Sequence, residues 1–129
     1  GEAPPLPGKV ASREELLALR ELVLHVPAAE AVKAYAARLT LATHPDYETA
    51  VPSVKAYVKF GASPRGAQAL LRCAKVLALT QGRFHVAIED LRRMAKPALR
   101  HRLILNFEGE ASGVDAGAIL DEVLARVTS

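Results

Sequence analysis

The segment from Gly61 to Gly66 places side chains at a helix start where they could bind an anion. Ser63 is a favoured N-cap residue, and Pro64 suits the first helical position because it has no N–H group to lose. Arg65 then falls in the first turn, where unpaired backbone N–H groups disfavour a cation unless an anion lies in front of it. Because helix starts are natural phosphate sites, the backbone and the guanidinium could address the same anion.

Other residues with chemical potential are scattered along the chain. The single cysteine, Cys73, cannot build a zinc site, and a small core residue is the expected role of a lone thiol in an apolar helix. The His44-Pro45-Asp46 segment is typical of a solvated turn rather than a metal loop. Gly-x-x-x-x-Gly-Lys, Gly-x-Gly-x-x-Gly and His-Glu-x-x-His motifs do not occur in the sequence. We therefore expect no metal site and no catalysis by this chain alone.

Five fixed positive charges lie within residues 92–102, and this basic stretch could follow the phosphates of a nucleic acid. It consists of Arg92, Arg93, Lys96, Arg100 and Arg102, with His101 among them. No aromatic residue is interleaved for base stacking, and Glu89 and Asp90 come one turn earlier. A solvated helix face is favoured, and nucleic-acid binding is kept as a minor alternative. The pattern assigns no role to Arg100, His101 or Arg102.

The composition is that of one soluble, mainly helical domain. Half of the 129 residues are hydrophobic, only 5% are aromatic, and the net charge is +3. Alanine and leucine favour helices over sheets. One cysteine excludes an internal disulfide and fits a reducing compartment. No apolar run approaches the roughly 20 residues that span a bilayer, so we expect a cytoplasmic protein without a membrane span.

Capping and periodicity predict helices over residues 13–24, 29–43 and 64–80. The first begins at the Ser12–Glu15 capping box, with Leu16, Leu19, Val23 and Val26 on one face. Residues 1–10 form a Pro- and Gly-rich lead-in, and 45–60 are expected to be irregular apart from a short helical turn. A fourth helix begins near Ile88 and is interrupted at Pro97, and a last one follows Asp115.

Two short extended segments, 84–86 and 103–105, could pair as a small β-ribbon that leans on the helices. The fold class is therefore mainly α: a helical bundle with a two-stranded ribbon.

These residues resemble the C-terminal lid of MoxR-type AAA+ ATPases. The resemblance rests on Gly61-Ala62-Ser63-Pro64-Arg65 before an Ala/Leu-rich helix, then Gly82-Arg83, Glu89-Asp90-Leu91 and Leu99-Arg100-His101-Arg102-Leu103. It covers residues 11–129 and implies the AAA+ lid fold. In that family the arginine of the first element is the sensor-2 residue, which reaches the phosphates of ATP on a neighbouring large domain. Arg65 matches that position.

The resemblance implies ATP as the cofactor, with Mg²⁺ held by the large domain, and no nucleotide bound tightly by the lid alone. Arg65 would be the catalytic residue. Ser63, Pro64 and Gly66 would join it around the nucleotide, with Gly66 allowing a nucleotide or a neighbouring backbone to approach closely. The implied partners are the large domain, other subunits of a homo-oligomeric ring and a von Willebrand factor A domain protein. The implied role is chaperone-like remodelling coupled to ATP hydrolysis.

Two departures from the family pattern stand out. Ala87 lies where the family often has Ser, Thr or Asp, so the helix start at Ile88 is expected to fray for lack of a side-chain cap. The nucleotide-binding and arginine-finger motifs belong to the family's large domain, and the sequence is expected to be a lid without it. A helical protein-interaction module, with Arg65 a mere surface residue, is the main alternative.

Overall fold

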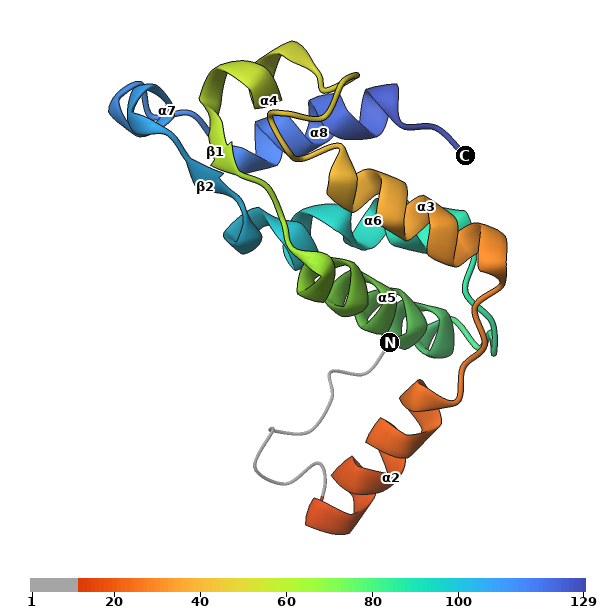
Figure 1. Ribbon diagram of the computed structural model, residues 1–129. Coiled ribbons are helices and arrows are strands. Elements are labelled where there is room, and N and C mark those ends of the chain that lie inside the picture. The colour runs from red at the N-terminus through yellow and green to blue at the C-terminus, as the bar shows by residue number, and fades with distance from the viewer. Residues whose placement is uncertain (1–11) are drawn as a thin grey trace.

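Seven α-helices and a two-stranded ribbon form the part of the chain that the computed structural model describes, residues 12–129 (Figure 1). The helices are α2 (Arg13–Leu24), α3 (Glu30–Leu41), α4 (Pro52–Tyr57), α5 (Pro64–Thr80), α6 (Ile88–Leu99), α7 (Phe107–Ala111) and α8 (Ala116–Arg126), with a 3-10 turn at Arg100–Arg102. The strands are β1 (Val58–Phe60) and β2 (Ile104–Leu105). The mainly helical fold with a small ribbon is thus confirmed. Within the described residues, no helix is long and apolar enough to cross a membrane.

The core lies where α3, α5, α6 and α8 meet. Its largest fully buried side chains include Tyr35, Leu39, Leu70, Leu91, Leu99, Ile119 and Leu120. The buried face of α5 is made mostly of small residues, namely Gly66, Ala69, Ala74 and Ala78. Small side chains let two helices approach closely, and α5 makes its most extensive contacts with α6. α5 is therefore the central helix against which the others are placed.

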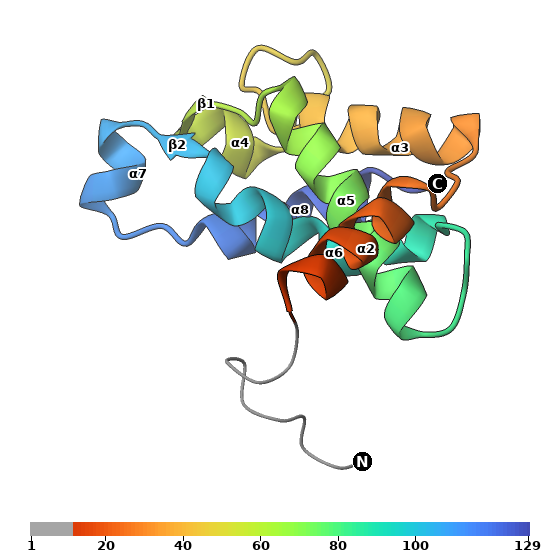
Figure 2. The same cartoon turned by 90° about the horizontal axis from the view of Figure 1, so that it is seen from below.

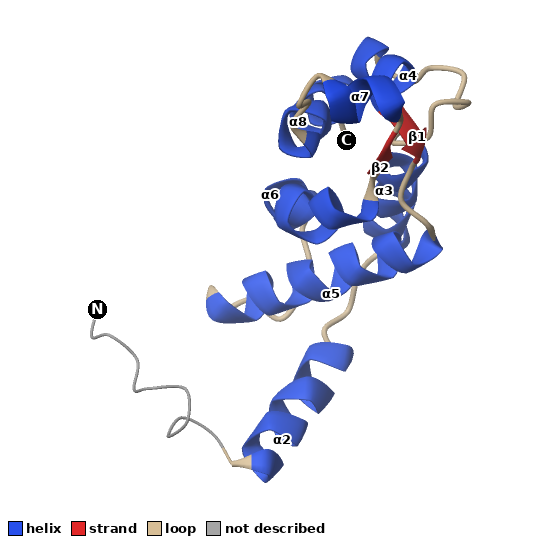
Figure 3. Cartoon of the chain, turned by 90° about the vertical axis from the view of Figure 1, so that its left-hand side faces the viewer, coloured by secondary structure: helices blue, strands red, loops and turns tan. Residues whose placement is uncertain are grey.

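Helix α2 stands apart from this bundle (Figure 3). It has the predicted bounds, and the Ser12–Glu15 capping box is present, with Glu15 N–H donating to Ser12 Oγ at 3.1 Å. Val23 and Val26 are buried as expected. Leu16 and Leu19, however, are 56% and 54% exposed, because α2 packs chiefly on α5 and leaves much of its apolar surface uncovered.

The ribbon forms with a different partner from the one expected. β2 pairs antiparallel with β1, with Val58 opposite Leu105 and Phe60 opposite Ile104. Residues 84–86 instead lie in the loop between α5 and α6, where the N–H of Val86 donates to the carbonyl of Pro27 at 3.2 Å. The prediction that 84–86 form the second strand was wrong, because burial of Val86 beside the α2–α3 connection outweighs its extended propensity.

Residues 52–60, expected to be irregular apart from one helical turn, form α4 and β1. Pro52 occupies the first helical position, but the preceding Val51 cannot cap. Glu122 of α8 supplies the cap, accepting bonds from the backbone N–H and the hydroxyl of Ser53 at 3.0 and 2.9 Å. These two bonds lower the pKa of Glu122. A contact from a distant helix thus stabilises a short element that its own sequence does not cap.

Helix α6 continues through Pro97 to Leu99, so the predicted interruption was wrong. Leu91, Ala95 and Leu99 are buried along one face of α6, and this packing overrides the loss of one backbone hydrogen bond at the proline. The helix tightens into the 3-10 turn only after Leu99.

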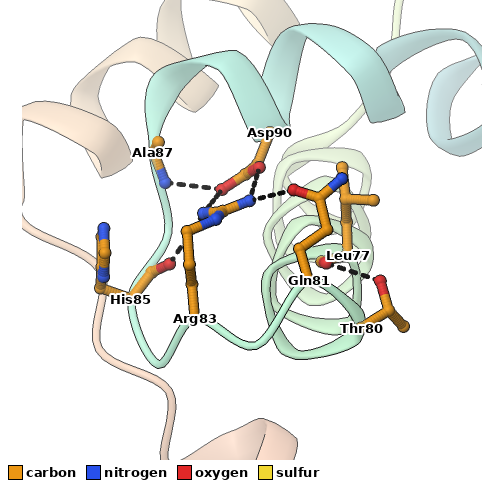
Figure 4. Close-up of polar contacts among 7 residues, drawn as sticks. All are labelled: Leu77, Thr80, Gln81, Arg83, His85, Ala87 and Asp90. Atoms are coloured by element: carbon orange, nitrogen blue, oxygen red, sulfur yellow. Dashed lines mark hydrogen bonds and ion pairs between the residues drawn. The ribbon is translucent and has the colours of Figure 1, made fainter.

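Arg83 and Asp90 join the end of α5 to the start of α6 (Figure 4). Both guanidinium Nη atoms donate to the Asp90 carboxylate, at 2.8 and 2.7 Å, and Nη2 also donates to Gln81 Oε1. The carboxylate in turn accepts the backbone N–H of Ala87 at 2.8 Å. The start of α6 therefore has a cap despite Ala87, contrary to the expected fraying. Asp90 is only 2% exposed, and the bonds from Arg83 hold its pKa below the ordinary value.

We expect Asp90→Asn to lower the free energy of unfolding at pH 7 by about 2 kcal/mol, less than for a fully buried pair because Arg83 is partly exposed. Since the folded-state pKa of Asp90 lies below the unfolded value of about 3.9, its contribution is complete above that pH and lost as the pH falls. Urea unfolding at several pH values should show the two proteins converging toward pH 3.

Asp121→Asn is the matched control, because Asp121 pairs with Lys96 on the surface and should cost less than about 1 kcal/mol. A constant difference between the Asp90 variant and the parent from pH 7 to pH 3 would contradict the linkage.

Candidate functional site

Arg65 lies at the exposed start of α5. Its backbone N–H donates to the hydroxyl of Ser63 at 3.2 Å, so Ser63 is the N-cap and Pro64 the first helical residue, as predicted. The first turn of α5 holds no acidic residue. The Arg65 side chain is exposed and has no hydrogen bond or ion pair with any residue from 12 to 129. The Arg65 guanidinium therefore lies at the positive end of the α5 dipole, and the two together favour an anion at this surface point.

The chain just before α5 is tied to the end of α3. The buried hydroxyl of Thr43 accepts the N–H of Ala62 at 2.9 Å and donates to the carbonyl of Thr40 at 2.6 Å. The Nε2 atom of His44 lies 2.7 Å from the carbonyl oxygen of Ala62, which requires the ring N–H on that nitrogen. Ala62 is therefore held through both of its backbone polar groups, and the position of Arg65 follows from this junction.

Gly61 is needed at this junction because the backbones approach closely. A Cβ atom at Gly61 would lie 2.6 Å from the carbonyl oxygen of Thr43, a distance that requires a backbone shift. Sequence reasoning found Gly61 through its motif. It missed Thr43, and it placed His44 in a solvated turn without its contact to Ala62. The junction is thus assembled from two segments that are 18 residues apart in the chain.

Gly66 points into the bundle. It is buried, and a Cβ atom there would meet Ala62 Cβ at 3.1 Å, Leu99 Cδ2 at 3.3 Å and Arg102 Cδ at 3.4 Å. The structure therefore places Ser63, Pro64 and Arg65 together on the surface and places Gly66 beneath them. Gly66 acts as a packing residue that lets the start of α5 approach the end of α6.

The basic stretch 92–102 is divided among internal partners. Arg92 donates to the hydroxyl of Tyr35 at 2.6 Å and to the carbonyl of Val127 at 3.0 Å, which holds the C-terminal segment. Lys96 pairs with Asp121. Arg102 donates to the carbonyl of Ala98 at 3.2 Å. Three of the five fixed charges in the basic stretch are thus engaged within the fold. This arrangement favours a structural role over a continuous phosphate-binding face.

A shallow apolar hollow adjoins Pro64. It has a volume of about 320 Å³ and is lined by Ala37, Thr40, Leu41, His44, Ala62, Pro64 and Ala67. The positive charge of Arg65 therefore lies next to an apolar hollow on the surface. Within residues 12–129, no three His, Cys, Asp or Glu side chains gather closely enough to hold a metal ion.

Comparisons with known proteins bear on this site. A family model described as the AAA lid domain matches residues 52–123, more than half of the chain. "Chaperone MoxR1" of Mycobacterium tuberculosis is 32% identical over 127 residues, which cover 98% of this chain and 34% of that protein. "Uncharacterized protein YeaC" of Bacillus subtilis is 31% identical over 120 residues, which cover 92% of this chain and 34% of that one. The chain spans about a third of the length of these curated relatives.

A solved structure from Cytophaga hutchinsonii, described as a "putative ATPase", has the same arrangement. It is similar to this chain with a TM-score of 0.83 and 33% sequence identity, over 94% of this chain and 36% of that one. The likeness covers almost the whole chain.

We expect Thr43→Val to lower the free energy of unfolding by about 2 kcal/mol, because it leaves the buried N–H of Ala62 without a partner. Thr43→Ser keeps the hydroxyl and removes one methyl group, and it should cost about 1 kcal/mol or less. Urea unfolding at neutral pH measures both. Equal losses for the two variants would mean that the hydroxyl does not hold the junction.

Proposed function

Because this chain belongs to the AAA lid domain family, we propose that it is the lid of a MoxR-type AAA+ ATPase and that Arg65 contacts the phosphates of ATP bound by the large domain. The observation that carries this proposal is the exposed Arg65 guanidinium at a helix start without acidic residues, on a rigidly tied junction. Ser63 and Pro64 contribute by setting where the helix begins. Gly66 contributes by packing, since it is buried.

The chemistry explains why such a residue matters. Phosphoryl transfer to water is accelerated mainly by positioning and by positive charge placed where the phosphate oxygens gain charge. A guanidinium also offers two parallel N–H donors to a phosphate, which a lysine cannot do. The Thr43–Ala62 and His44–Ala62 bonds limit the movement of the backbone that carries Arg65. Mg²⁺ would be held by the large domain.

The same contact would couple nucleotide state to movement of the lid. Loss of the γ-phosphate removes the anionic partner of Arg65, so the lid is expected to rotate relative to the large domain after hydrolysis. In a homo-oligomeric ring this rotation would drive chaperone-like remodelling of a client, and a von Willebrand factor A domain protein is the proposed partner. The similarity to the Mycobacterium tuberculosis protein, which is named a chaperone, supports this class of activity.

We expect Arg65→Ala in the full-length protein that carries this lid to lower the kcat of ATP hydrolysis by about 100- to 1000-fold, as removal of one transition-state donor does. Arg65→Lys should recover only part of the loss, because it restores the charge but not the two-pronged donor geometry. Steady-state phosphate release measures both variants.

Gln68→Ala is the matched control, since Gln68 is exposed one turn further along α5 and should leave kcat unchanged. Unaltered hydrolysis and nucleotide affinity in the Arg65→Ala protein would refute the role of Arg65.

A further inference from the structure

An apolar groove lies between α2 and α5, away from Arg65. It has a volume of about 630 Å³, and its floor is formed by Leu16, Leu19, Val23, Leu24, Cys73 and Val76. Arg20 and Arg72 lie at its rim and have no ion pair within residues 12–129. We call these eight residues the α2–α5 groove. Seven of the twelve residues of α2 are apolar, and an uncovered apolar surface rimmed by charge is typical of a protein-binding site.

The chain also carries an apolar projection. Phe107, the first residue of α7, is 88% exposed, more than any other exposed large hydrophobic residue in the described part of the chain. The exposed carboxylates of Glu108 and Glu110 follow it, and neither has an ion pair with residues 12–129. We call Phe107, Glu108 and Glu110 the α7 knob.

The α7 knob is held in its outward position by the backbone around it. Asn106 caps α7 by accepting the N–H of Gly109 at 2.8 Å, and its amide donates to the carbonyl of Ala56 at 2.7 Å. Gly109 is buried, and a Cβ atom there would lie 2.9 Å from the carbonyl oxygen of Tyr57. Since this face of α7 is fixed against α4, Phe107 stays exposed without rearrangement of the fold.

We propose that the α7 knob of one copy of this chain docks in the α2–α5 groove of a second copy. Phe107 would enter the apolar floor formed by α2 and Val76. Glu108 and Glu110 would face the rim arginines, Arg20 and Arg72. The two surfaces are complementary in two ways. An exposed aromatic side chain meets an apolar groove, and two carboxylates meet two guanidinium groups, none of the four having an ion pair within residues 12–129.

The contact must join different copies in a head-to-tail manner. The α7 knob and α2 lie at opposite ends of the molecule (Figures 1 and 3), so one chain cannot fill its own groove. Figure 2, seen from below, shows α7 at one edge of the molecule and α2 in front of α5, well separated from α7. A head-to-tail contact uses two different surfaces and generates rings when its rotation closes. The inference does not depend on Arg65 or on nucleotide.

The test mixes variants of the 129-residue chain, with mass measured by sedimentation equilibrium up to about 1 mM, the range for small interfaces. The unaltered chain is expected to self-associate with increasing concentration. Phe107→Glu removes the knob and Leu19→Glu removes the groove, so each variant alone should associate at least tenfold more weakly. Their mixture should form a 1:1 complex, because one intact knob and one intact groove remain.

A second experiment exchanges the charges of the α7 knob and of the α2–α5 groove. Glu108→Arg with Glu110→Arg, and Arg20→Glu with Arg72→Glu, should each abolish association, and mixing the two double variants should restore it. Leu41→Glu is the matched control, because Leu41 is 50% exposed but lies outside both surfaces. Circular dichroism verifies that each variant is folded.

Three results would overturn the proposal. The unaltered chain could remain monomeric over the whole concentration range, which would leave the groove to another partner such as the large domain. Association could persist in the Phe107→Glu or the Leu19→Glu protein, which would place the interface elsewhere. The mixture of folded single variants could fail to associate, which would exclude the knob-in-groove arrangement.

Discussion

The buried hydroxyl of Thr43 holds the chain that leads into α5, and the position of Arg65 depends on it. That hydroxyl bonds the end of α3 to Ala62, two residues before the first residue of α5, and the approach is so close that Gly61 has no room for a Cβ atom. The packing of α5 on α3 and α6 fixes the direction of this helix, so the tied start and the packing together set where its first side chains project. A lid residue that must meet a phosphate needs this kind of support.

Two arginines at opposite ends of α5 have opposite surroundings. Arg83 follows the helix and is neutralised by the buried carboxylate of Asp90, with which it ties α5 to α6. Arg65 opens the helix and has no carboxylate partner in the described residues. The first arrangement serves stability, because both charges are satisfied inside the fold. The second leaves a cation available at a helix start, where an anion is favoured.

Local signals in the sequence predicted the elements that local chemistry determines. The Ser12–Glu15 box and the Ser63-Pro64 start gave two helix beginnings correctly, because a cap depends on residues within four positions. The resemblance to MoxR-type lids is likewise confirmed, by the match to the AAA lid family together with the similarity to the Mycobacterium tuberculosis relative. The same Ser63-Pro64 start predicted that Arg65 lies in the first turn of the helix. The ligand of Arg65 stays a prediction.

Contacts between distant segments escaped prediction. The sequence indicated that residues 103–105 would pair with another strand, but the choice of 58–60 over 84–86 depends on burial of Val86 near Pro27. Glu122 caps α4, and the hydroxyl of Thr43 accepts the N–H of Ala62. Both bonds join residues far apart in the chain, and no periodic pattern in the sequence indicates them. Gly66 could be placed on α5 from sequence, but only packing against Leu99 and Arg102 showed that it faces inward.

The most direct measurement is a crystal structure of the full-length protein with a non-hydrolysable ATP analogue. The account predicts a guanidinium nitrogen of Arg65 within about 2.7–3.2 Å of a terminal phosphate oxygen, with the Thr43–Ala62 junction unchanged. A bound triphosphate whose oxygens are satisfied by other residues, with Arg65 directed into solvent, would contradict it.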